Sequence, residues 1–183
     1  MKPVFDRAHR ALALVVDPLC KMSLVISAIC MIVLALLVFF QVMTRYLDMG
    51  VVWASDLAGY ALVATTFLAM APTLRNAIHV RVSVLIANVP GRGRIALELW
   101  CYAVGLALAI YATRWATVQV IESYRFGDVS IGIVAFKLWV PQIPIAVGFA
   151  IFALTLLEGL LAILAGKPTA ESLADAASPG SHD

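Results

Sequence analysis

The chain has 183 residues, of which 63% are hydrophobic and only 13% are charged, and its formal net charge is +2. Soluble domains are about half apolar and a quarter charged, so this composition indicates an integral membrane protein. A span needs about 20 apolar residues, which limits the chain to about five or six spans and leaves no length for a sizeable soluble domain. The small net charge, without runs of one sign, argues against a nucleic-acid partner.

Residues 1–21 come before the first apolar run and carry several charges. Phe5, Leu12 and Leu19 fall on one helical stripe, with Arg10 and Asp17 opposite, so the segment predicts an amphipathic helix in the membrane interface. It lacks the pattern of a cleavable signal peptide, and we expect the span that follows to be retained.

Four apolar runs are long enough to cross a bilayer, and they predict a membrane domain over residues 22–166. The predicted spans are about 22–45, 53–74, 96–121 and 138–165. Asp56 would lie in the first turn of the second helix, where the helix dipole favours an anion. Arg114 is the only charge between residues 99 and 121. It lies close enough to one end of the third run for its guanidinium to extend toward the headgroups, which is our interpretation, with an intramembrane ion pair as the alternative.

Lysine and arginine counts predict the orientation of this four-helix, all-α membrane protein. Nine such residues lie in the two ends and the second loop, against four on the opposite side, so both termini are expected in the cytoplasm. Residues 75–90 alternate like a strand but also form a helical stripe, and we expect an interfacial helix because an unpaired strand edge cannot face lipid. Residues 167–183 are expected to form a disordered cytoplasmic tail.

Residues that would support catalysis or cofactor binding are not arranged to do so. The three histidines lie outside the predicted spans, the three cysteines form no CxxC pair, and the acidic residues stay near span ends. Haem ligation, thiol exchange and proton pumping each need a different arrangement. We therefore expect no catalytic residue, no metal site and no cofactor, and a protein that is not an enzyme.

Small residues recur at every fourth position on two of the predicted spans, which would let helices approach closely. The candidate packing residues are Ala61, Thr65 and Ala69 on the second span, and Gly105, Ala109 and Thr113 on the third.

Three stretches carry a family resemblance that covers roughly residues 22–160. They are "FQVMTRY", "WASDLAGYALVATTFLAMAPTLRNAIHVRVSVLIANVP" and "GDVSIGIVAFKLWVPQIPIAVGF". The chain resembles the small membrane subunit, DctQ-like, of tripartite ATP-independent periplasmic (TRAP) transporters. One departure is Ser55, which stands where the family usually has the first of two adjacent acidic residues, so that "WASD" keeps only Asp56.

The resemblance implies a multi-pass protein of the bacterial inner membrane that takes part in secondary active transport. Such a subunit scaffolds a large membrane subunit in a stable complex, helps dock a periplasmic substrate-binding protein transiently, contacts membrane lipid, and supports sodium-driven uptake of an organic acid. Candidate subunit-interface or structural residues are Gln41, Arg45, Trp53, Asp56, Arg75, His79, Arg81, Pro90, Ser130 and Pro141.

Three alternatives remain open from the sequence. The chain could be a stand-alone four-helix carrier or channel rather than a subunit. Arg45 and Asp56 are expected to interact or share partners across the short first loop, whereas the alternative is two solvated interfacial charges. Arg75, His79 and Arg81 could contact either anionic lipid or the large subunit.

Overall fold

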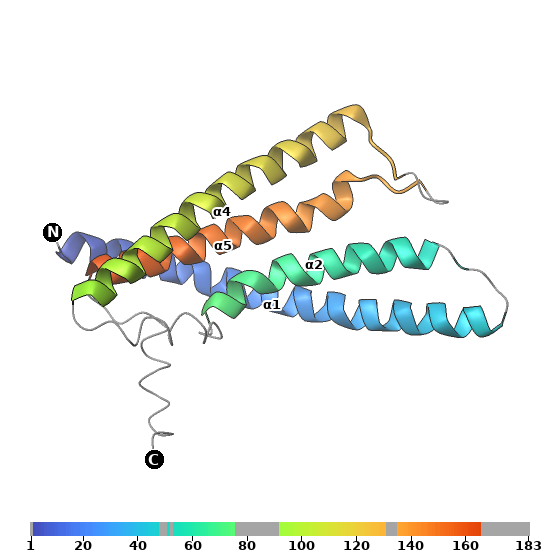
Figure 1. Cartoon of the computed structure of the whole chain (residues 1–183), viewed down its shortest axis with the longest axis horizontal. Helices are drawn as coiled ribbons and strands as arrows, with labels where there is room; N and C mark the ends of the chain where they lie inside the picture. Colours follow the sequence, from blue (N-terminus) through green and yellow to red (C-terminus); the bar gives the residue numbers. More distant parts are fainter. Residues whose placement is uncertain (1, 48–50, 52, 76–91, 131–134, 166–183) are drawn as a thin grey trace, which may run out of the picture.

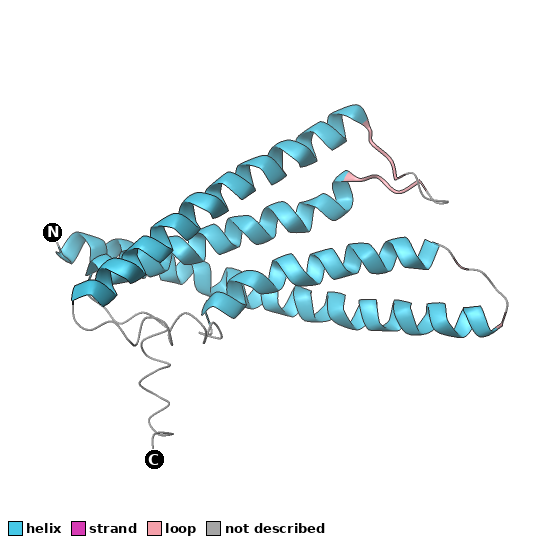
Figure 2. Ribbon diagram, in the orientation of Figure 1, coloured by secondary structure: helices cyan, strands magenta, loops and turns pink. Residues whose placement is uncertain are grey.

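The structure is a computed structural model that describes residues 2–47, 51, 53–75, 92–130 and 135–165. The described residues form four helices and no strand (Figures 1 and 2). The helices are α1 (Lys2–Tyr46), α2 (Trp53–Arg75), α4 (Arg92–Phe126) and α5 (Trp139–Ala165). Each contains a stretch long and apolar enough to cross a membrane. The predicted all-α fold with four membrane-spanning helices is therefore confirmed.

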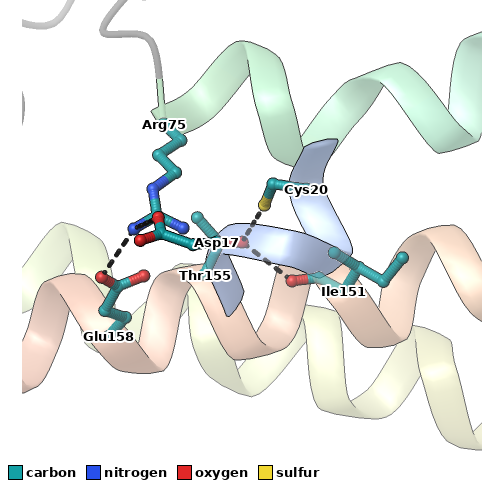
Figure 3. A network of polar contacts seen from close by, with 6 residues as sticks. All are labelled: Asp17, Cys20, Arg75, Ile151, Thr155 and Glu158. Carbon is teal, nitrogen blue, oxygen red and sulfur yellow. Dashed lines mark hydrogen bonds and ion pairs between the residues drawn. The ribbon is translucent and has the colours of Figure 1, made fainter. Parts of the chain in front are cut away.

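Helix α1 is continuous where the sequence suggested two segments. It runs through Pro18 without a break, and its first third crosses behind α5 in Figure 1. The buried side chains in this part include Val16 and Cys20, whereas the neighbouring Val15 is 53% exposed. Asp17, expected on the polar side, points toward α2 and α5 (Figure 3). The interfacial position of residues 1–21 stays a prediction.

The inward face of α1 follows a regular pattern of spacings. Buried or half-buried residues recur at alternating intervals of four and three, at Val16, Cys20, Ser23, Ser27, Cys30, Leu34, Leu37, Gln41 and Thr44. This mean spacing of about 3.5 is that of helices that wind around each other with a shallow crossing angle. Small and hydroxylated members of the series let α2 approach closely, and the Ser23 hydroxyl donates to the main-chain oxygen of Leu68. The result is a tightly paired α1 and α2.

Helix α5 is the central element, because it packs against each of the other three helices. Gly148 lies against α2, where a Cβ atom would come within 2.5 Å of the Phe67 carbonyl oxygen. Gly159 lies against α4, and a Cβ there would overlap the Tyr102 ring. Gly148 thus permits the contact that joins the α1–α2 pair to the α4–α5 pair, and Gly159 permits the close contact within the α4–α5 pair.

Helix α4 has the fewest neighbours, since its substantial contact within the chain is with α5. Ala109 is buried and Gly105 is in ordinary contact with Leu156. The two helix pairs diverge toward the right of Figure 1 and leave much of α4 uncovered. Trp100 is 68% exposed and Tyr111 is 64% exposed.

Helix α4 ends at Phe126, five residues beyond the span predicted from hydropathy. Gly127 adopts a left-handed conformation with φ of 66°. The Asp128 amide donates to the Ser123 carbonyl at 3.1 Å, which completes a Schellman cap. A short antiparallel bridge between Val129 and Lys137 then returns the chain toward α5.

The predicted packing residues occupy mixed positions. On α4, Ala109 is buried and Gly105 and Thr113 are half-buried; on α2, Ala61, Thr65 and Ala69 are all half-buried. The hydroxyls of Thr65 and Thr113 donate to carbonyls of their own helices, at 2.8 and 2.7 Å. The most buried positions of α2 are Ala54, Ala58, Ala64, Leu68, Ala71 and Pro72. A packing role for the predicted α2 stripe stays a prediction.

Candidate functional site

Three charged side chains from three different helices meet near the Arg75 end of α2. Nη2 of the Arg75 guanidinium contacts the Asp17 carboxylate of α1 and lies 3.1 Å from Oε1 of Glu158 on α5 (Figure 3). We call Asp17, Arg75 and Glu158 the charged cluster. Because each member comes from a different helix, the cluster fixes the relative position of α1, α2 and α5.

The members of the charged cluster differ in burial, and so in their energetic weight. The Glu158 side chain is 12% exposed and Arg75 is 24% exposed, whereas Asp17 is 53% exposed. An exposed ion pair contributes about 0 to 1 kcal/mol, but removing one partner of a buried pair costs several times more, because a charge is then left unpaired. The Arg75 to Glu158 pair should therefore matter more than the Arg75 to Asp17 pair.

The charged cluster has unused hydrogen-bonding capacity. Nη1 of Arg75 is buried without a hydrogen-bond partner among the described residues, and so is Nδ1 of His9. A guanidinium offers five N–H donors, and this one uses Nη2 for both carboxylates. The arrangement can hold helices together, and it can accept a further oxygen ligand at Arg75. Within the described ranges no three His, Cys, Asp or Glu residues are grouped as a metal site would need.

A second set of polar contacts lies beside the charged cluster, along the surface where α1 meets α5. The Cys20 thiol and the Thr155 hydroxyl are 3.7 Å apart, and the Thr155 hydroxyl donates to the Ile151 carbonyl at 2.9 Å (Figure 3). Val16, Cys20, Ala71 and Ile151 form a buried apolar group around these contacts. Polar and apolar contacts together thus join α1, α2 and α5 at this end of the bundle.

The opposite end of the bundle carries most of the other predicted candidates. Gln41 is half-buried in α1, and its carbonyl accepts from the Thr44 hydroxyl at 3.1 Å. Trp53 begins α2 and packs against Phe40 with ring centroids 6.2 Å apart. Pro141 is half-buried in the first turn of α5, where the missing amide hydrogen is tolerated. The Ser130 amide donates to the Phe136 carbonyl at 2.8 Å.

Arg45 and Asp56 share this end, but no ion pair joins them in the described residues. Arg45 is exposed in the last turn of α1, and Asp56 is half-buried in the first turn of α2. Each charge has the sign that its helix end favours. The expectation that they share a partner stays a prediction.

His79, Arg81 and Pro90 lie outside the described residues, and so does the interfacial helix expected over residues 75–90 apart from Arg75 itself. Arg75 pairs with Asp17 and Glu158, and its expected contact with lipid or with a partner subunit stays a prediction. One feature of the sequence indicates the pairing of Arg75 with Glu158. Glu158 is the single charge in the apolar run of α5. Because α2 and α5 cross the membrane in the same direction in a four-span chain, Glu158 is expected at a depth similar to that of Arg75 at the end of α2.

Comparison with known protein families gives one match. The family described as tripartite ATP-independent periplasmic transporters, DctQ component, matches residues 34–166. The matched region starts within α1 and ends just after α5, so it includes α2, α4 and the Arg75 and Glu158 members of the charged cluster. No curated protein matches the chain.

Proposed function

This chain belongs to the DctQ component family of the TRAP transporters of the bacterial inner membrane, and on that premise we propose that it is a small permease subunit, not an enzyme. In this role it scaffolds a large membrane subunit, which carries the substrate and sodium sites. It also helps to dock the periplasmic substrate-binding protein during sodium-driven uptake of an organic acid. The observation that carries the proposal is the family match, which covers most of the membrane domain.

The uneven packing of the four helices supports a scaffolding role. Helices α1, α2 and α5 are joined by the charged cluster and by buried small residues, whereas α4 rests on α5 and leaves Ile110 55% exposed. A helix that packs against one neighbour can gain further van der Waals contacts only from lipid or from another protein. A stable partner subunit fits this surface.

The proposed orientation places the two ends of the bundle in different roles. With both termini in the cytoplasm, the charged cluster lies near the cytoplasmic face, and Arg45, Trp53 and Asp56 lie at the periplasmic rim. Tyr46 and Phe126, at the rim ends of α1 and α4, are 83% and 78% exposed. Such a rim offers aromatic and charged groups to a soluble protein that binds transiently.

Reconstitution into liposomes tests the proposed function. Liposomes would contain this chain, the large subunit, or both, with the substrate-binding protein and its organic acid outside and an inward sodium gradient. We expect uptake that requires both membrane chains, the binding protein and sodium. Equal uptake by the large subunit alone would contradict the scaffolding role, and specific flux through this chain alone would favour the stand-alone carrier or channel.

Docking of the binding protein is tested at the periplasmic rim. We expect liposomes with both membrane chains to retain more binding protein than liposomes with the large subunit alone. Arg45→Ala should lower that retention, while Arg125→Ala, which changes another exposed arginine at the same end of the bundle, serves as the matched control. Retention that is unaffected by the small chain would contradict a docking role.

A further inference from the structure

An open apolar groove runs along the contact between α4 and α5. Its volume is about 500 Å³, and it is lined mainly by Leu106 and Ile110 of α4 and by Ala150, Ala153, Leu154 and Leu157 of α5. We call this the α4–α5 groove. The alanines leave space between larger aliphatic side chains, which is the surface on which a neighbouring transmembrane helix can pack.

Thr113 and Arg114 line the same groove. Arg114 lies twelve residues from the end of α4 at Phe126. It also lies twelve residues from Tyr102, whose ring lies against Gly159 of α5, next to Glu158 of the charged cluster. At 1.5 Å per residue, each distance is about 18 Å along the helix axis. Arg114 therefore lies near the middle of the span, deeper than the hydropathy pattern suggested, because α4 continues beyond residue 121.

Aromatic side chains mark the rim of the bundle above Arg114. Tyr124 and Trp139 pack edge to face with ring centroids 5.7 Å apart, and such residues favour the membrane interface. Tyr124 is ten residues, or about 15 Å, from Arg114. Side chains on a helix also lean toward its N-terminus, so the guanidinium starts out in the direction away from this rim. Extension to these headgroups is thus a poor explanation for Arg114.

No carboxylate of the described chain neutralises Arg114. Glu122 and Glu98 are the nearest acidic residues along α4, at about 12 Å and about 24 Å of axial distance. Glu158 of α5 is paired with Arg75. Arg114 is exposed beside an apolar groove, and charged residues at this depth are normally paired or face a polar cavity. The missing counter-charge must come from outside the described chain.

We propose that the α4–α5 groove receives a transmembrane helix of the large subunit, and that a carboxylate on this helix pairs with Arg114. The inference rests on the proposed function, which supplies the partner. The groove accommodates the aliphatic side chains of the incoming helix, and Arg114 sets its depth and rotation through one charge-assisted contact. A charge at a single interior position is well suited to fixing such a register.

Site-specific photo-crosslinking in the co-expressed complex tests the location. A photoreactive phenylalanine derivative would replace Ile110, which lines the groove, and in a matched control Leu108, which is exposed on α4 without lining it. We expect the large subunit to be captured from position 110 at least about fivefold more than from 108, by direct contact across a packed interface. The captured helix should carry Asp or Glu within its membrane span.

Several results would overturn the inference. They are capture of lipid alone at position 110, equal capture of the large subunit at 108 and 110, and capture of a helix without a carboxylate. In each case the unmodified chain can still co-purify with the large subunit, so the proposed function survives. Failure of the unmodified chain to co-purify would instead remove the proposed function itself.

A charge-removal cycle tests the ion pair. Arg114→Leu should lower the amount of large subunit that co-purifies with this chain about tenfold, because a carboxylate is left unpaired at the interface. Arg114→Lys should have an intermediate effect on this recovery. Arg125→Leu, beyond the groove, is the matched control and should leave recovery unchanged. Neutralising the crosslinked carboxylate together with Arg114→Leu should restore most of the recovery. A double variant as poor as Arg114→Leu alone would reject the pairing.

Discussion

The two helix pairs of this chain are built differently. Helices α1 and α2 meet along a regular series of residues, several of them small or hydroxylated, and α5 joins them through Gly148, Thr155 and the charged cluster. Helix α4 contacts α5 and leaves an open apolar groove beside Arg114. The first region pairs the charges of Asp17, Arg75 and Glu158 within the chain, whereas the second leaves Arg114 without an ion pair among the described residues. The difference separates the part that holds the subunit together from the part available to a partner.

The largest loss of stability is expected from Arg75→Met, which leaves Glu158 without its cation in a largely buried position. The free energy of unfolding, measured by denaturing-detergent titration in mixed micelles, should fall by about 3 kcal/mol. Adding Glu158→Leu should recover most of this loss, because no unpaired charge remains. If the double variant is as unstable as Arg75→Met, the ion pair does not explain the effect. Arg45→Met, at the other end of α1, is the control.

Gly148→Ala should destabilise the α2 to α5 contact by about 2 kcal/mol, since the added Cβ meets the Phe67 main chain, which cannot rotate away. Gly59→Ala is a matched control because no atom lies within 4 Å of a Cβ at that position. There the helix propensity of alanine should raise the free energy of unfolding by about 0.5 to 1 kcal/mol. Similar effects of the two substitutions in the same titration would contradict the packing described here.

Gly159→Ala should cost about 1 kcal/mol, less than Gly148→Ala, although its Cβ would also overlap a neighbour. The obstacle here is the ring of Tyr102 on α4, and both the ring and the less constrained helix can shift. The change in the free energy of unfolding is measured by the same denaturing-detergent titration. A loss larger than that of Gly148→Ala would mean that α4 is held as firmly as α2.

The smallest effect is expected from Asp17→Asn, because the Asp17 carboxylate is half exposed. The free energy of unfolding should fall by no more than about 1 kcal/mol, and the loss should shrink at high salt as the ion pair is screened. Glu122→Gln, an exposed acidic residue of α4, is the control. A loss equal to that of Arg75→Met would show that Asp17 rather than Glu158 is the main partner of Arg75.

The number of membrane-spanning helices could be predicted because it depends on local hydropathy and length. The faces by which the helices pack against each other were harder to predict from the sequence. The buried series on α1 includes Ser23, Ser27 and Thr44, which hydropathy assigns to no apolar stripe. The close approaches on α5 depend on which helix lies opposite, and no spacing rule distinguished Gly148 and Gly159 from other glycines.

The charged cluster was also difficult to predict from the sequence. Arg75 was a candidate from its sequence position, but its partners Asp17 and Glu158 lie 58 and 83 residues away. Their meeting depends on α1 continuing unbroken through Pro18 and crossing α5. A long helix with an internal proline is difficult to predict locally, since proline usually ends or kinks a helix. The depth of Arg114 was missed for a related reason, because α4 extends past its apolar run.

Co-purification from the native membrane tests the central claim most directly. A tagged form of the full chain, extracted in mild detergent and purified by its tag, should bring down one large multispan protein in constant ratio, and a tagged four-span protein of unrelated family should not. We expect the complex to survive size-exclusion chromatography. Recovery of the chain alone, under conditions in which the large subunit is present and soluble in the same extract, would contradict it.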